Sequence, residues 1–206
     1  MRIHSEYFTQ IVRFLHQIAV FYTKRWVDAS FSYNIKCLYK GITRGGFKMF
    51  RKMRRFKQQL TDEECINVIK EQVRGVLSVH GEDGYPYGLP INYWYNEADG
   101  CFYFHCARTG HKIDAIKAND KVSLCIYDEG YREEGDWALN IKSVIIFGTM
   151  KIVEDMDKKL EICRGLVSNF PAEDGYAEDE FNKLGKVVCC LQLTPDYMSG
   201  KLVNES

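Results

Sequence analysis

The chain has 206 residues, of which 46% are hydrophobic and 27% are charged, and its formal net charge is zero. This is the composition of an ordinary globular protein, which excludes a largely disordered chain. The length suits one sizeable core with an appendage.

The charge is unevenly distributed. Residues 1–57 hold thirteen Lys and Arg residues against Glu6 and Asp28, a formal charge of +11, so the remaining residues carry −11. A basic arm of this kind can contact nucleic acid or a membrane surface. The alternative that we favour is that residues 1–52 lie upstream of the true start, because Met53 opens a start-like segment. We therefore expect no nucleic-acid partner.

We also expect no membrane partner. The only long apolar run of the arm, residues 8–22, is interrupted by Arg13 and His16. A membrane span needs about 20 predominantly apolar residues, so this run predicts no such span. An amphipathic surface helix remains an alternative for it.

The cysteine pattern argues against metal binding. None of the eight cysteines belongs to a C-x-x-C pair, and most lie inside apolar runs as small core residues. We predict no metal site, a reduced cytoplasmic location, and Cys189 and Cys190 on opposite faces of a terminal strand.

The first predicted elements are a helix and a hairpin. Thr61 and Glu64 form a capping-box pattern that starts a helix ending near residue 74. Residues 75–80 and 85–95 are then two antiparallel strands around a tight Gly-Glu-Asp-Gly turn. Because proline has no backbone N–H to donate to a neighbouring strand, Pro90 indicates that the second strand is irregular or lies at an edge.

A strand, a helix entrance and a second strand follow. Residues 101–106 alternate, with the two phenylalanines on one face and Tyr103 and His105 on the other, which predicts a half-buried strand. Thr109 is expected to cap the next helix, and Lys112 adds a positive charge at the same end. Together these features predict an anion site. A strand over residues 121–128 continues the alternation.

The C-terminal third predicts a long strand over 137–153 with a bend at Gly148, then a helix over 154–170. An acidic loop and a last strand over 187–193 complete the chain. These elements predict a mainly β (α+β) fold, a small antiparallel closed or split β-barrel with two or three peripheral helices. The predicted buried stripe of the last helix is Met156, Leu160, Cys163 and Val167.

Four segments, GEDGYPYGLPINYWY, FYFHCARTGHKIDAIKAND, SVIIFGTMKIVED and MSGK, together resemble the pyridoxamine 5'-phosphate oxidase-like family of FMN-binding split barrels. The resemblance is to its nitroimidazole-resistance branch and extends from about Met53 to the C-terminus. It implies that residues 53–206 are one FMN-binding split-barrel domain, with residues 1–52 as an extension.

The resemblance also implies a set of flavin-binding residues. The flavin phosphate would be held at the helix start, the ring would lie over the PINYWY strand, and His105 would lie beside the ring as the catalytic residue. The residues implied are Pro90, Asn92, Tyr93, His105, Gly110, His111, Lys112 and Ser143. The residues alone leave alternatives open: Lys112 and His111 as plain surface residues, His105 as a core histidine, and Trp94 as a packing residue rather than a lid.

The functional prediction is a flavin-dependent oxidoreductase. The sequence shows neither a nucleophile elbow nor a G-x-G-x-x-G fingerprint, which suits a cofactor enzyme that NAD(P)H visits as a transient electron donor. The resemblance implies FMN, with FAD as the alternative, a nitroaromatic or 5-nitroimidazole acceptor, and a homodimer with the flavin between two subunits. The C-terminal segment TPDYMSGKLVNES lacks the arginine of pyridoxamine phosphate oxidases proper, which argues against that activity. The competing hypothesis is a non-catalytic flavin- or haem-binding storage or sensor protein.

Overall fold

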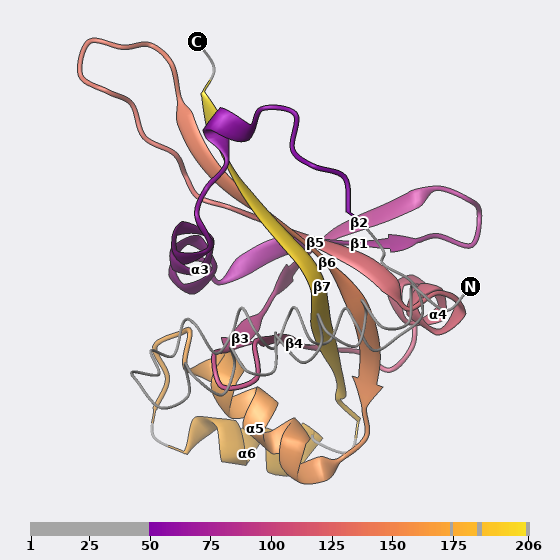
Figure 1. The fold of residues 1–206 in the computed structure, drawn as a ribbon. Coiled ribbons are helices and arrows are strands. Elements are labelled where there is room, and N and C mark those ends of the chain that lie inside the picture. The colour runs from indigo at the N-terminus through magenta and orange to yellow at the C-terminus, as the bar shows by residue number, and fades with distance from the viewer. Residues whose placement is uncertain (1–49, 174, 185–186, 205–206) are drawn as a thin grey trace, which may run out of the picture. The chain divides into compact units, whose positions relative to one another are not determined.

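The computed structural model describes residues 50–173, 175–184 and 187–204 (Figure 1). The extension predicted for residues 1–52 falls almost wholly outside these ranges. In chain order the elements are η1 (Phe56–Gln58), α3 (Asp62–Glu71), β1 (Arg74–His80), β2 (Pro86–Asn92), β3 (Trp94–Asn96), β4 (Cys101–Cys106), α4 (His111–Ala118), β5 (Lys121–Tyr127), β6 (Asn140–Val153), α5 (Met156–Val167), α6 (Tyr176–Leu184) and β7 (Cys189–Asn204).

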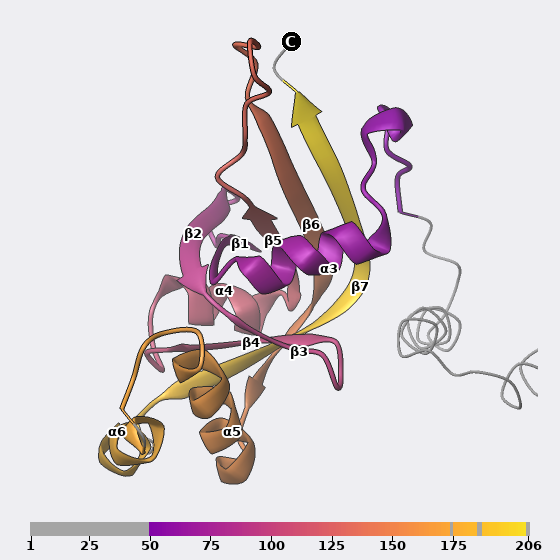
Figure 2. The ribbon, with the colours of Figure 1, turned by 90° about the vertical axis from the view of Figure 1, so that its left-hand side faces the viewer.

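The seven strands form one antiparallel sheet in the order β2-β1-β5-β6-β7-β4-β3. Because β2 and β3 follow each other in the chain and yet occupy the two edges, the sheet must curl around its core. Figures 1 and 2 show this curl, with α3 lying along the sheet and α5 and α6 beside β3 and β4. The predicted mainly β split-barrel fold is confirmed, although the described residues hold four α-helices rather than two or three.

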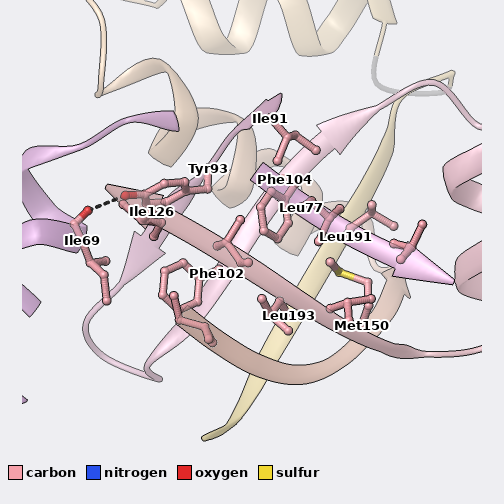
Figure 3. Packing of buried hydrophobic residues seen from close by; sticks show 14 of the residues in the cluster. Ile69, Leu77, Ile91, Tyr93, Phe102, Phe104, Ile126, Met150, Leu191 and Leu193 are labelled. Atoms are coloured by element: carbon pink, nitrogen blue, oxygen red, sulfur yellow. Dashed lines mark hydrogen bonds between the residues drawn. The ribbon is translucent and has the colours of Figure 1, made fainter. Parts of the chain in front are cut away.

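The chain passes from one edge of the sheet to the other at Tyr93. The sequence predicts one strand over residues 85–95, whereas the structure has β2 and β3 on either side of Tyr93. The Tyr93 amide donates to the Val73 carbonyl at 3.2 Å, and its hydroxyl donates to the Ile69 carbonyl at 2.8 Å (Figure 3). These bonds hold the break in place. The edge position of β2 agrees with the prediction from Pro90.

Both faces of β4 are buried from Cys101 to Phe104. Phe102 and Phe104 point into the larger core inside the curled sheet, as their alternation predicts (Figure 3). The other face was expected to be only half-buried, but α5 covers it. Cys101 and Tyr103 therefore belong to a second core, together with Ile162 of α5.

The last strand is longer than predicted. The sequence predicts a strand over residues 187–193, but β7 continues through Pro195 to its end at Asn204. The pairing of β6 with β7 shifts between Phe147 and Gly148, so that Gly148 faces Pro195 and Asp196 has no opposite residue. A β-bulge of this kind tolerates a proline, because the ladder is already interrupted there. The bend predicted at Gly148 is confirmed.

The helices α3 and α4 differ in how their N-termini are capped. α3 has the predicted capping box, in which the Glu64 amide donates to Thr61 Oγ1 at 3.2 Å and the Thr61 amide donates to Glu64 Oε2 at 2.8 Å. The cap predicted for α4 is wrong. Gly110 rather than Thr109 is its N-cap residue, and no side chain caps the helix. Gly110 has φ +121, a conformation that favours glycine.

The buried stripe of α5 differs from the predicted one. Met156, which was expected to face the barrel, is 44% exposed. The helix is rotated so that Gly165 lies against Trp94, where a Cβ atom would come within 2.1 Å of the indole ring. The residues that α5 buries are Lys159, Ile162 and Leu166.

The first residue that the structure describes, Phe50, packs against the sheet. The Phe50 ring stacks on Tyr197 with 4.6 Å between ring centroids, and on Phe147 with 5.8 Å. Packing therefore begins ahead of Met53, where the domain is predicted to start. No helix in the described ranges is long and apolar enough to cross a bilayer.

Candidate functional site

The start of α4 offers backbone donors. The Gly110 carbonyl accepts the amides of Ile113 at 2.8 Å and Asp114 at 3.2 Å. The preceding amides, those of His111 and Lys112, have no partner within the helix, because the first turn of any α-helix leaves its amides unpaired. They therefore remain available to an anion, which the positive end of the helix dipole also favours.

Two side chains at this helix start add to the site. Lys112 is half-buried and forms no ion pair with any residue that the structure describes. The His111 ring stacks on Tyr87 of β2, with 4.2 Å between ring centroids and an interplanar angle of 17°. This contact fixes His111 between α4 and the sheet edge. His111 is thus more than an isolated surface side chain.

His105 lies at the end of β4, close enough to α4 that the charge of Lys112 affects the pKa of its imidazole. The residue is exposed overall, yet the protein atoms around the imidazole remove enough water to lower its pKa from the ordinary value of 6.5, and the Lys112 ammonium lowers it further. Both causes disfavour the imidazolium. His105 is therefore a neutral imidazole at pH 7, able to donate one hydrogen bond and accept another.

His105 also lines a pocket of ≈ 230 Å³. Two sheet residues, His105 and Asn92, form one wall, and Asn92 Oδ1 accepts from Arg74 Nε at 2.8 Å. The opposite wall comes from α5, α6 and the segments next to them, and it is largely apolar. Its residues are Cys163, Leu166, Val167, Phe170, Tyr176, Ala177, Glu180, Phe181 and Val188.

Sequence reasoning missed this second wall. The segment after Pro171 was predicted to be an acidic loop, whereas residues 176–184 form α6. Its acidic residues in the first turn complement the helix dipole, and the Arg164–Glu178 ion pair, with Nε and Oε1 2.6 Å apart, ties α6 to α5. The spacing of Ala177, Glu180 and Phe181 on one helix face was the available signal.

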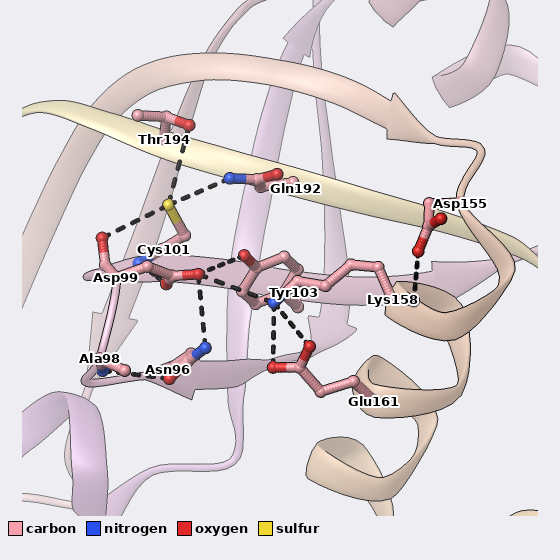
Figure 4. A network of polar contacts seen from close by, with 10 residues as sticks. All are labelled: Asn96, Ala98, Asp99, Cys101, Tyr103, Asp155, Lys158, Glu161, Gln192 and Thr194. Carbon is pink, nitrogen blue, oxygen red and sulfur yellow. Dashed lines mark hydrogen bonds and ion pairs between the residues drawn. The ribbon is translucent and has the colours of Figure 1, made fainter.

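A polar network holds α5 against the β3–β4 hairpin (Figure 4). The Tyr103 hydroxyl donates to Asp99 Oδ2 at 2.6 Å, and Lys158 Nζ lies 2.9 Å from Glu161 Oε1 and 3.8 Å from Asp99 Oδ2. Lys158 Nζ also lies 4.6 Å from the centroid of the Tyr103 ring. Because α5 carries one wall of the pocket, this network positions that wall relative to His105.

Comparison with known proteins identifies the family. The family model described as pyridoxamine 5'-phosphate oxidase matches residues 61–202, from the N-cap of α3 to the last residues of β7. The chain belongs to the pyridoxamine 5'-phosphate oxidase family. No curated protein matches the sequence.

Solved structures share the fold of this family member at low sequence identity. A proposed 5-nitroimidazole antibiotic resistance protein of Bacteroides thetaiotaomicron has a TM-score of 0.58 at 18% identity, over 71% of this chain and 87% of that one. A conserved hypothetical protein of Mycobacterium tuberculosis has a TM-score of 0.61 at 16% identity, over 73% and 90%. An FAD-binding protein of Mesorhizobium loti has a TM-score of 0.54 at 22% identity, over 71% and 97%.

The structure of this pyridoxamine 5'-phosphate oxidase family member does not gather all the predicted site residues. It brings His105 close to Lys112 and places His105 and Asn92 in one pocket. Pro90 lies exposed on the edge strand β2, two residues before Asn92. The Tyr93 side chain is 1% exposed and lies in the core, so only its backbone is available to a ligand.

Ser143 lies on β6, two strands away from the β4 strand of His105 in the sheet. It pairs with Tyr127, the last residue of β5, and its hydroxyl donates to the Lys201 carbonyl at 3.5 Å. The structure also places Trp94 as a packing residue, because its ring contacts α5 and lies 5.3 Å from the Tyr103 ring. That placement supports the packing interpretation over a lid. No cluster of three or more metal-ligating side chains occurs among the described residues.

Proposed function

We propose that this protein is a flavin-dependent oxidoreductase that holds the phosphate of FMN at the start of α4 and passes electrons from NADH or NADPH to a small acceptor. The observation that carries the proposal is the closeness of a cationic helix start, at Lys112, to a pocket that contains His105. Membership of the pyridoxamine 5'-phosphate oxidase family supports it. FAD is the alternative cofactor, because it could present a phosphate to the same amides.

The residues at the start of α4 fit a phosphate. The donors are backbone amides and the Lys112 ammonium, with no carboxylate paired to that lysine among the described residues. A Cβ atom placed on Gly110 would meet no heavy atom within 4 Å, so the space beside this backbone is open. A doubly charged phosphate would gain charge-assisted hydrogen bonds there.

His105 is the residue that we expect to contact the electron acceptor. Redox chemistry is what a bound flavin supplies, and the protein contributes binding and orientation. As a neutral imidazole, His105 can hydrogen-bond a nitro or carbonyl oxygen of an acceptor in the pocket. A nitroaromatic or 5-nitroimidazole acceptor is the narrower proposal, supported by the shared fold of the Bacteroides thetaiotaomicron protein.

We further propose a homodimer with the flavin between two subunits. Tyr127 and Phe147, on the outer face of β5 and β6, are 55% and 41% exposed, and exposed aromatic patches often mark interfaces. Ser143 lies beside Tyr127 on this part of the sheet, where it would serve a flavin shared with the partner subunit. A cytoplasmic location is supported by the seven described cysteines, all of which are free thiols.

The absorption spectrum of the purified full-length protein, together with NADH and NADPH oxidation against nitro, quinone and azo acceptors, tests this function. We expect the two absorption bands of an oxidised flavin and acceptor-dependent oxidation of one nicotinamide. Flavin bands without turnover would support the storage or sensor hypothesis instead. A single intense Soret band would indicate haem and contradict the proposal.

A further inference from the structure

The pocket that contains His105 has one acidic side chain in its lining. Among the described residues that line it, Glu180 of α6 supplies the only carboxylate, and no lysine or arginine takes part. Ala177, Glu180 and Phe181 are spaced three and four residues apart, so they lie on one face of α6. Ala177 is buried. Packing of this helix face therefore brings the Glu180 carboxylate to the pocket.

The ion pairs of α6 lie outside the pocket. Arg164 Nε on α5 lies 2.6 Å from Glu178 Oε1, which holds α6 against α5 two residues before Glu180. Lys183 Nζ lies 3.1 Å from Glu180 Oε1, but the Lys183 side chain is 67% exposed and does not line the pocket. An ion pair as exposed as this is weak, because water screens both charges. An ammonium group bound in the pocket can therefore compete with Lys183 for the Glu180 carboxylate.

The sheet wall of the pocket offers hydrogen-bond donors instead. Asn92 Oδ1 accepts from Arg74 Nε at 2.8 Å, which leaves the two N–H groups of the Asn92 amide to donate. His105 adds one ring N–H. Tyr176 supplies a neutral hydroxyl on the helix wall. The pocket thus has donors on its sheet wall and an anion on its helix wall, and most of its other lining residues are apolar.

We propose that Glu180 selects the electron acceptor, favouring a small aromatic molecule that carries an ammonium group at the end opposite its nitro or carbonyl group. This inference rests on the proposed function, which requires an acceptor in this pocket. The nitro or carbonyl oxygen would accept from the donors of the sheet wall, and the ammonium would pair with Glu180. Phe170 and Phe181 supply aromatic surface for the ring.

The same carboxylate should disfavour anionic acceptors. A carboxylate in place of the ammonium would bring two negative charges together in a pocket of ≈ 230 Å³. Discrimination then has an attractive and a repulsive component. Because the Glu180 side chain is 38% exposed, each component should be modest and should weaken as the salt concentration rises.

Equilibrium binding measures this preference without turnover. The probes are 4-nitrobenzylamine, 4-nitrobenzyl alcohol and 4-nitrophenylacetate, which share the ring and the nitro group and are cationic, neutral and anionic at pH 7. Isothermal titration calorimetry of the full-length protein, as purified, gives each affinity. We expect the amine to bind roughly fivefold more tightly than the alcohol, and the acetate roughly fivefold more weakly. High salt should narrow both differences.

Substitutions on α6 identify the residue responsible. Glu180→Gln should bring the three affinities together while leaving the affinity for the alcohol unchanged. Lys183→Met removes the competing surface cation, so it should widen the preference for the amine. Asp179→Asn is the matched control, because it removes the same charge from an exposed neighbour that does not line the pocket. This variant should keep the wild-type preference.

Three results would overturn the inference: equal affinities of the wild-type protein for the three probes, no binding of any probe, or a preference that survives Glu180→Gln. An equal loss of the preference in Asp179→Asn would also overturn it, because the overall charge of α6 would then be responsible. Failure of the proposed function is seen separately, as missing flavin bands or missing acceptor-dependent oxidation of NADH and NADPH.

Discussion

The Lys112 ammonium on α4 acts on the His105 imidazole on β4, and it is the second cause, after desolvation, of the lowered pKa of that histidine. The relationship joins the two parts of the proposed site. An anion that neutralises Lys112 would weaken this effect, so His105 should report the occupancy of the helix start.

Replacing Lys112 with methionine should raise the pKa of His105, because one of its two lowering causes is removed. Desolvation remains, so the pKa should stay below 6.5. An NMR titration of the histidine ring protons measures it, with His105→Gln assigning the resonance. Lys117→Met, an exposed lysine in the last turn of the same helix, is the control and should change little. A His105 pKa that is unchanged or lower in Lys112→Met would contradict the coupling.

His105 should influence turnover more than flavin retention. Replacing it with alanine should slow reoxidation of the reduced protein by a nitroaromatic acceptor by on the order of 10²-fold, because the hydrogen bond that His105 donates to the acceptor is lost. Because its pKa is lowered, any acid limb of wild-type activity should lie below pH 6.5. His105→Gln should restore positioning but lose that limb. Stopped-flow absorbance across pH measures these rates, and equal rates for wild type and the alanine variant would make His105 a packing residue.

The break between β2 and β3 depends on Tyr93. Tyr93→Phe leaves the Ile69 carbonyl without the 2.8 Å bond in the core, which should lower the free energy of unfolding by about 1–3 kcal/mol. Urea denaturation followed by circular dichroism measures this change. Tyr85→Phe, at a residue that is 74% exposed, should have little effect. Equal midpoints for the two variants would show that the Tyr93 hydroxyl contributes nothing.

The packing of α5 on β3 depends on the absence of a side chain at Gly165. Gly165→Ala would place a methyl group within 2.1 Å of the Trp94 ring, so α5 must shift or the indole must turn. We expect a loss of about 1–3 kcal/mol in the free energy of unfolding, typical of overpacking. Gly88→Ala is the matched control, since its Cβ would lie at an ordinary 3.6 Å from its nearest neighbours. Thermal unfolding compares the two, and an unperturbed Gly165→Ala variant would count against the close contact.

Local signals in the sequence were sufficient where neighbouring residues decide the structure. The capping box of Thr61 and Glu64 and the alternation of residues 101–106 predicted α3 and β4 correctly. Long-range contacts decided the rest. The split at Tyr93 depends on bonds to Ile69 and Val73, and the extension of β7 through Pro195 depends on a bulge in its pairing with β6.

The candidate site likewise has one part that local sequence signals predict and another that depends on long-range contacts. Lys112 and His105 could be singled out from one continuous segment of sequence and its resemblance to a known family. The other wall of the pocket could not, because it needs α6, whose acidic composition favours a loop, and the packing of α5 around Gly165. Only the folded chain brings Cys163 to the same pocket as His105.

Flavin binding at the start of α4 is the central claim, and an FMN titration of the full-length protein, followed by quenching of flavin fluorescence, tests it most directly. We predict that wild type and Lys117→Ala bind FMN with equal affinity. Lys112→Ala should bind roughly 10- to 100-fold more weakly, because a charge-assisted hydrogen bond is worth about 1.5–3 kcal/mol. Wild-type protein that binds no FMN, or a Lys112→Ala variant with unchanged affinity, would contradict the claim.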